Sequence, residues 1–187
     1  MKKTLIYTFA SLAIAIGSFY CSSSQSTPDA GVQKIVIIRH GEKPDEGDNL
    51  SCQGLNRAME LPPVLNQKVG MPAAIFVPSL KLGKSTGVAR MYQTIVPFAV
   101  KYNLAINSKF DVDDAEGLAD GIKKQHGTVL VVWEHKAITK ILKALGIQGK
   151  EKWDDNDFDG MWVITYKNGV GTLTKDQEGL HPGASCP

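Results

Sequence analysis

The chain has 187 residues, 43% hydrophobic and 21% charged, which fits one globular domain and excludes a chain that is disordered throughout. Its formal charge of +2 includes Lys2 and Lys3, and without them 19 basic residues stand against 19 acidic ones. Because the remaining chain has no basic surplus, we do not expect a general binder of nucleic acids or of anionic membranes.

The first twenty residues are ordered like a secretory signal. Lys2 and Lys3 precede a largely apolar run over residues 5–17, and small and polar residues follow it. A membrane-spanning helix needs ~20 apolar residues, and this run is shorter. We therefore predict a signal peptide over residues 1–20 and an exported protein.

Cys21 ends this region, and the serine-rich residues after it are typical of a flexible polar tether. We assign residues 21–32 to the tether and residues 33–187 to a single domain. The position of Cys21 resembles that of the lipidated cysteine in bacterial lipoproteins. Such signals carry a small residue before the cysteine, and this chain has Tyr20, so a lipoprotein and a simply secreted periplasmic protein both stay open.

Export affects the interpretation of the other two cysteines. In an oxidising compartment Cys52 and Cys186 are the natural disulfide pair, although two free thiols stay open. Closing so long a loop contributes roughly 4–5 kcal/mol in the chain-entropy model. Neither cysteine has a neighbouring Cys or His at ligand spacing, so we expect no metal site there.

Four short apolar runs predict buried strands that are covered on both faces, as in a mostly parallel sheet. They cover residues 35–38, 73–77, 129–133 and 161–166. Helical spacing of apolar residues lies between them, over residues 95–102 and 138–145. A further helix is predicted to begin near Gln53 with Ser51 as its cap, and to be interrupted or kinked at Pro62 and Pro63. The alternation predicts an α/β fold, a three-layer α/β/α sandwich around a mostly parallel sheet.

Titratable side chains follow two of these strands directly. Arg39 and His40 end the first, and Glu134 and His135 follow the run that ends at Trp133. Because ligands bind beyond the carboxyl ends of such strands, we expect both histidines at one edge of the sheet. Imidazole is a nucleophile, acid or base near neutral pH, and the arginine fork matches phosphate oxygens. The combination favours attack on phosphorus over attack on an acyl group.

Four segments, in this order, resemble the histidine phosphatase superfamily, whose fold is that of phosphoglycerate mutases. They are Arg39-His40-Gly41, Leu50 to Ala58, Ala89 to Thr94 and Val131 to His135. The segment Glu42-Lys43-Pro44 and the chain end from Glu178 to Pro187 resemble an exported bacterial subgroup. The resemblance covers residues 33–187 and implies a phosphoglycerate mutase-like domain.

The resemblance also implies roles for individual residues. His40 would be the nucleophile that forms a phosphohistidine, with its other ring nitrogen donating to a backbone carbonyl or a similar partner. Arg39 and Arg90 would bind the phosphoryl oxygens, and His135, cationic while phosphate is bound, would complete the pocket. Such an enzyme needs no metal and no organic cofactor.

The general acid is where the sequence departs from the family. Many members carry an aspartate directly after the second histidine, and this chain has Lys136. We choose Glu134 as the acid because of its proximity, although neighbouring cations favour its ionised form, and we rank Asp114 second. For Glu42 we consider another role than general acid, in which its carboxylate orients a neighbouring arginine.

Two further motifs are set aside. The segment Gly83-Lys84-Ser85-Thr86 resembles the end of a phosphate-binding loop, but Pro78 stands where that loop requires glycine. The acidic segment 153–159 lacks the glycine and final glutamate of a calcium loop, and we assign it to a solvated loop near the pocket edge.

The prediction is therefore an exported phosphomonoesterase that acts on a small phosphorylated molecule or on a phosphate group of the cell envelope. We place it in the periplasm or, if Cys21 carries lipid, on a membrane of the bacterial envelope. Two alternatives stay open: a surface lipoprotein that binds a phosphate ligand without turnover, and a phosphomutase.

Overall fold

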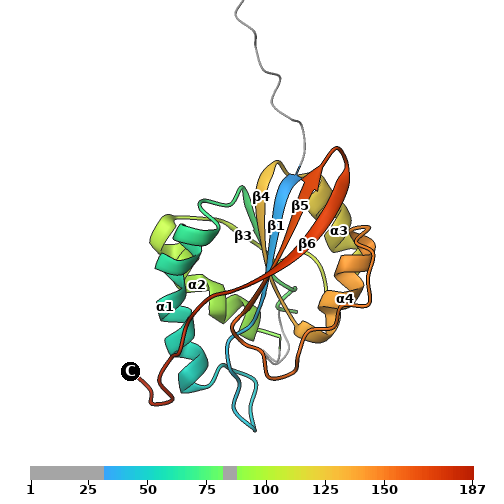
Figure 1. The fold of residues 1–187 in the computed structure, drawn as a ribbon. Helices are drawn as coiled ribbons and strands as arrows, with labels where there is room; N and C mark the ends of the chain where they lie inside the picture. The colour runs from blue at the N-terminus through green and yellow to red at the C-terminus, as the bar shows by residue number, and fades with distance from the viewer. Residues whose placement is uncertain (1–31, 82–87) are drawn as a thin grey trace, which may run out of the picture.

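The computed structural model describes residues 32–81 and 88–187 (Figure 1). The predicted signal peptide, almost all of the tether with Cys21, and the segment 83–86 lie outside the described residues. Among the helices of the described part, none has both the length and the apolar character needed to cross a membrane.

A six-stranded sheet forms the middle layer, with the strand order β3-β2-β4-β1-β5-β6. The strands β3, β2, β4 and β1 run parallel to one another, whereas β5 pairs antiparallel with β1 and β6 pairs antiparallel with β5. The bounds are Val32–Arg39 for β1, Ala74–Phe76 for β2, Ile106–Asn107 for β3, Gly127–Trp133 for β4, Gly160–Lys167 for β5 and Val170–Gln177 for β6. The four strands expected from the sequence are present, and the sheet is mostly parallel as predicted.

Helices cover both faces of the sheet, so the predicted three-layer α/β/α arrangement is confirmed (Figure 1). Helices α1 (Cys52–Lys68) and α2 (Arg90–Tyr102) lie on one face. Helices α3 (Ala115–Lys123) and α4 (His135–Ala144) lie on the other. The strands β3 and β6 and the helix α3 were not among the predicted elements.

The central strand β1 shows why its sequence is apolar at successive positions. Val36 and Ile38 pack in the core beneath α1 and α2, whereas Ile35 and Ile37 pack in the core beneath α3 and α4. All four side chains are at most 1% exposed. A strand covered on both faces buries every side chain, and each contributes roughly 1.5–3 kcal/mol of hydrophobic stabilisation.

Of the two effects predicted for the prolines, an interruption or a kink, the interruption is wrong, because α1 continues through Pro62 and Pro63 to Lys68. Ser51 caps its start as expected, with its hydroxyl accepting a hydrogen bond from the Gly54 N–H at 3.1 Å. Apolar side chains on both sides of the prolines, among them Ala58 and Leu65, pack in the same core. This packing outweighs the backbone hydrogen bonds that the two prolines cannot donate.

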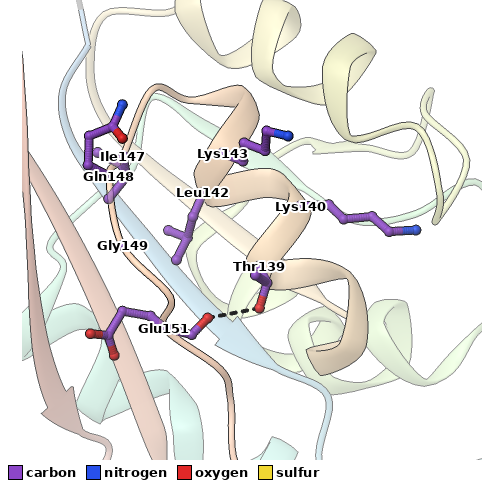
Figure 2. Close-up of a pocket in the computed structure, with 8 residues that line it drawn as sticks. All are labelled: Thr139, Lys140, Leu142, Lys143, Ile147, Gln148, Gly149 and Glu151. Atoms are coloured by element: carbon purple, nitrogen blue, oxygen red, sulfur yellow. Dashed lines mark hydrogen bonds between the residues drawn. The ribbon is translucent and has the colours of Figure 1, made fainter.

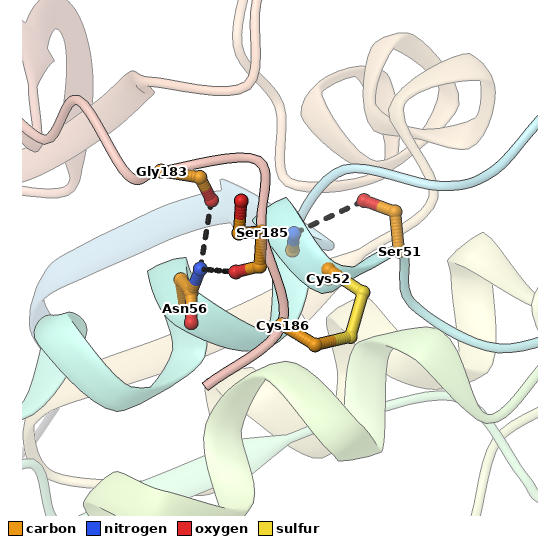
Figure 3. Close-up of a disulfide and its surroundings, with 7 residues drawn as sticks. Ser51, Cys52, Asn56, Gly183, Ser185 and Cys186 are labelled. Carbon is orange, nitrogen blue, oxygen red and sulfur yellow. Dashed lines mark hydrogen bonds between the residues drawn. A yellow bond between two sulfur atoms is a disulfide. The ribbon is translucent and has the colours of Figure 1, made fainter.

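A disulfide between Cys52 and Cys186 joins the start of α1 to the end of the chain, as predicted (Figure 3). The two Cα atoms are 4.5 Å apart. Beside it, the Asn56 Nδ2 donates to the backbone carbonyls of Gly183 and Ser185, both at 2.7 Å. The C-terminal segment is therefore fixed along the first turns of α1.

Candidate functional site

The carboxyl ends of β1 and β4 bring the two predicted histidines together. Arg39 pairs with Trp133 in the parallel register, so the residues that follow these two positions leave the sheet side by side. The ring centroids of His40 and His135 are 6.5 Å apart, with an angle of 69° between the planes. The expectation that both strands deliver a histidine to the same edge is confirmed.

His40 is held in the form that a nucleophile requires. The side chain is 3% exposed, and Nδ1 lies 2.6 Å from the Gly41 carbonyl oxygen. A carbonyl only accepts, so Nδ1 carries the proton and Nε2 keeps its lone pair. Burial, together with the charges of Arg39, Arg90 and His135, lowers the pKa of His40 to about 4, although the hydrogen bond to Gly41 opposes this shift. His40 is therefore neutral over most of the pH range.

Arg39 is 2% exposed and is anchored by backbone oxygens of the segment 154–159, which we call the acidic loop. Its Nη1 lies 2.9 Å from the Asp155 carbonyl oxygen, 3.1 Å from that of Asp157 and 3.4 Å from that of Asp154. The guanidinium carbon lies 3.8 Å from the centre of the Phe158 ring. Burial lowers its pKa to about 10, so it stays cationic at neutral pH. Nε is buried and has no hydrogen-bond partner among the described residues, so this N–H is an unsatisfied donor.

His135 is the first residue of α4 and is 9% exposed. Its Nε2 lies 3.1 Å from the Asp155 carboxylate, and its Nδ1 lies 3.6 Å from the Glu134 carboxylate, beyond hydrogen-bond distance. Burial and the charge of Arg39 lower the pKa of His135, while Glu134 and Asp155 oppose this. The cationic form that the sequence implies would therefore need the charge of a bound phosphoryl group.

Arg90, the third predicted phosphate ligand, begins α2 and is half-buried. Its Nε donates to the Asn49 carbonyl at 3.1 Å, and its Nη2 donates to the Gly47 carbonyl at 2.6 Å. The charge of Arg90 also contributes to the lowered pKa of His40. The helix start thus supplies a second arginine to the same edge of the sheet.

Thr94, one turn further along α2, supports the segment that follows β1. Its buried hydroxyl accepts from the Gly41 N–H at 2.9 Å and donates to the Arg90 carbonyl at 2.8 Å. On the other side, Gly54 of α1 packs so closely that a Cβ at this position would overlap the backbone of Glu42. Gly41 is therefore fixed from both α1 and α2, and its carbonyl in turn fixes the His40 ring.

The two candidates for the general acid lie in different surroundings. Glu134 is the residue before α4, its side chain is 32% exposed, and its charge acts on Arg39 and His135. Asp114 caps α3 by accepting from the Gly117 N–H at 2.9 Å, and it is exposed. The structure places Glu134 beside His135, where its charge also acts on Arg39, and gives Asp114 a capping role.

The sequence analysis missed two groups at the site. The acidic loop is more than a solvated edge, because its carbonyls hold Arg39 and Asp155 holds His135. Arg57 is the arginine that pairs with Glu42, and its sequence signal is limited to its place in the segment Leu50 to Ala58. A usable signal for the loop was its acidic run directly before a strand that pairs with β1.

Of two cavities in the described part of the molecule, one lies away from the predicted site residues and the other lies beside them. A cavity of about 330 Å³ on α4 and the following loop contains none of the predicted site residues (Figure 2). There the Thr139 hydroxyl donates to the Glu151 carbonyl at 3.0 Å. A second cavity of about 470 Å³ has Glu42, Arg57, Phe158 and His181 among its lining residues, and it therefore adjoins the segment that follows His40.

Among the comparisons with known proteins, only the one with solved structures finds similar proteins. No family model and no curated protein match the chain. A proposed phosphohistidine phosphatase SixA from Agrobacterium tumefaciens is 15% identical with a TM-score of 0.45, covering 76% of this chain and 96% of the other. A second one, from Nakamurella multipartitia, is 17% identical with a TM-score of 0.47, covering 78% and 89%. A variant phosphoserine phosphatase from Entamoeba histolytica, in complex with phosphoserine, is 13% identical with a TM-score of 0.49, covering 78% and 96%.

Proposed function

We propose that the protein is a phosphomonoesterase that works through a phosphohistidine on His40. The observation that carries this proposal is the state of His40: a buried, neutral imidazole with its Nδ1 proton bound by the Gly41 carbonyl and its Nε2 lone pair free. It stands among cationic or donating groups, as a nucleophile for a dianionic phosphate requires. Arg39 and Arg90 would bind the phosphoryl oxygens, and His135 would bind them once Asp155 releases its Nε2.

The reaction would proceed in two displacements. Nε2 of His40 attacks phosphorus, the P–N bond forms as the ester P–O bond breaks, and the leaving oxygen takes a proton from Glu134. Water then attacks the phosphohistidine and gives a proton to Glu134. The P–N bond breaks, which releases inorganic phosphate and returns neutral His40. The organic part of the substrate would occupy the 470 Å³ cavity beside the nucleophile's loop.

The proposed substrate class is a small phosphorylated molecule or an envelope phosphate group, met after export. The support for export is the N-terminal sequence, with its positive start and short apolar run. Cell fractionation of the full chain tests the location, and a Cys21→Ser variant separates a lipid-anchored protein from a freely secreted one.

The deciding experiment is hydrolysis of p-nitrophenyl phosphate by residues 22–187, beside His40→Ala and His40→Asn. We expect turnover by the unsubstituted protein, loss of turnover in both variants, and an acid-labile phosphoryl group on His40 after rapid quenching. Phosphate binding without turnover in the unsubstituted protein would refute the enzyme and leave a phosphate-binding protein. His126→Ala is the matched control, because that residue lies between α3 and β4, away from this edge of the sheet.

A further inference from the structure

Arg57 lies at the centre of a buried group of three carboxylates, which we call the Arg57 cluster. Its side chain is 5% exposed. Nε and Nη2 donate to the Glu42 carboxylate at 2.8–3.1 Å, and Nη1 donates to Asp159 at 3.1 Å and to Glu178 at 2.7 Å. The three partners come from three segments far apart in the chain, so the cluster joins parts of the fold that share no strand or helix.

Two of these segments are the ones that carry the site. Glu42 follows Gly41, whose carbonyl sets the proton on His40, and its own carbonyl accepts from the Ser51 N–H at 2.9 Å. Asp159 ends the acidic loop, which holds Arg39 through backbone carbonyls and His135 through Asp155. Arg57 is thus the described side chain that hydrogen-bonds both the residue after Gly41 and the acidic loop.

The third segment is the C-terminal one. The Glu178 N–H donates to the Asp159 carbonyl at 2.7 Å, and the Asp159 carboxylate accepts from the N–H groups of Gly179 and Leu180 at 3.0 and 2.8 Å. The disulfide then ties the end of this segment to α1, five positions before Arg57. The C-terminal segment therefore closes the Arg57 cluster from the outside.

The charges fit a fixed arrangement. One guanidinium faces three carboxylates, and burial raises the pKa of Glu178 to about 8 although Arg57 opposes this. With the proton on Glu178 the cluster holds one positive and two negative charges. Each of the three guanidinium nitrogens donates to a carboxylate, and Glu178 Oε1 is the buried carboxylate oxygen of the cluster without a hydrogen-bond partner among the described residues. A buried ion pair contributes little net stability over apolar packing, but removing one partner leaves an uncompensated charge.

We propose that Arg57 is a positioning residue for the phosphoryl-transfer site: by joining Glu42 to Asp159 it fixes the Gly41 carbonyl against His40 and the acidic loop against Arg39. Glu178 belongs to the same device and makes the C-terminal segment part of the site's support. The inference rests on the proposed role of His40 as nucleophile. Arg57 itself does not contact the substrate phosphate.

The test compares Arg57→Gln and Arg57→Lys with Lys68→Gln, which removes a cation of the same helix that pairs with Asp176, in a half-exposed ion pair. Two quantities are measured: kcat and KM for p-nitrophenyl phosphate, and the ¹⁵N chemical shifts of the His40 ring, which report its tautomer. We expect Arg57→Gln to lose about 100-fold in kcat, as for a ~1 Å misplacement of reacting groups, with a smaller change in KM. We expect its His40 Nδ1 and Nε2 shifts to move toward each other, and Arg57→Lys to recover part of both losses.

The proposal is overturned if a folded Arg57→Gln protein keeps the kcat and the ring shifts of the unsubstituted protein, with values equal to those of Lys68→Gln. If Arg57→Gln does not fold, Glu42→Gln weakens the same connection while Asp159 and Glu178 still pair with Arg57, and the same two readings apply. If the unsubstituted protein has no phosphatase activity, the proposed function fails. The ring shifts then still decide whether Arg57 positions His40.

Discussion

Removal of the disulfide is the perturbation whose size follows most directly from the structure. The two cysteines are separated by 134 positions, and for such a loop the chain-entropy model gives a stabilisation of about 5 kcal/mol. Domains of this size have a total stability of roughly 5–15 kcal/mol, so the double variant Cys52→Ala, Cys186→Ala should be close to the limit of folding. The native fold should persist in the cold, because Asn56 and Glu178 still hold the C-terminal segment by hydrogen bonds.

The assay is urea unfolding followed by tryptophan fluorescence, since Trp133, Trp153 and Trp162 are all buried. The free energy of unfolding is compared for the oxidised protein, the reduced protein and the double variant. Reductant should lower the stability of the first and leave that of the double variant unchanged. The oxidised protein is first shown to contain no free thiols. If its free energy of unfolding then falls by less than ~1 kcal/mol on reduction, the loop-entropy reasoning is refuted, because the C-terminal segment would be held by its other contacts alone.

Three further results are expected. Because burial lowers the pKa of His40 to about 4, kcat/KM should fall tenfold per pH unit below about pH 4. The free energy of unfolding should also decrease as pH falls from 6.5 to about 4, by up to ~1.4 kcal/mol per pH unit. A decrease of kcat/KM centred near pH 6.5 would contradict the burial of this ring. Burial, with Glu42 and Asp159 nearby, raises the pKa of Glu178 to about 8, so the free energy of unfolding should fall as pH rises from 4.5 to about 8. In urea titrations, Glu178→Gln should reduce this dependence of stability on pH. Glu134→Gln should reduce turnover of an alkyl phosphate by roughly 10²–10⁴-fold but of p-nitrophenyl phosphate far less, since nitrophenolate leaves without a proton; the same pattern from Asp114→Asn instead would move the acid to the start of α3.

The parts of the fold that could be predicted are those with a local signal. The runs in β1 and β4 are continuous and β-branched because both of their faces are covered, and such runs are rarely anything but buried strands. The edge strand β6 has most of its side chains exposed, and its polar sequence resembles a loop. Helix α3 has nine residues, which is too few for an apolar periodicity to stand out.

The histidine pair could be predicted for the same reason. Parallel neighbours end at the same edge, so His40 and His135 had to lie together once their strands were adjacent. No such rule places Arg57 beside Glu178, because 121 positions separate them and a charged pair has no period along the chain. The role of the acidic loop could not be predicted for a related reason. Backbone carbonyls of the loop hold Arg39, and no side-chain pattern encodes the direction of a carbonyl.

The contrast between the arginines shows what the structure adds. Arg39 and Arg90 are oriented by backbone carbonyls, which are dipoles without net charge, and neither forms an ion pair within 4.0 Å in the described part of the chain. Their positive charges are therefore fixed in place without a carboxylate in direct contact, which suits the proposed binding of a phosphoryl group. Arg57 is held by carboxylates, so its charge is neutralised within the fold. Under the proposed function, the three arginines thus divide into two that bind the phosphoryl group and one that supports them, and the difference lies in their hydrogen-bond acceptors.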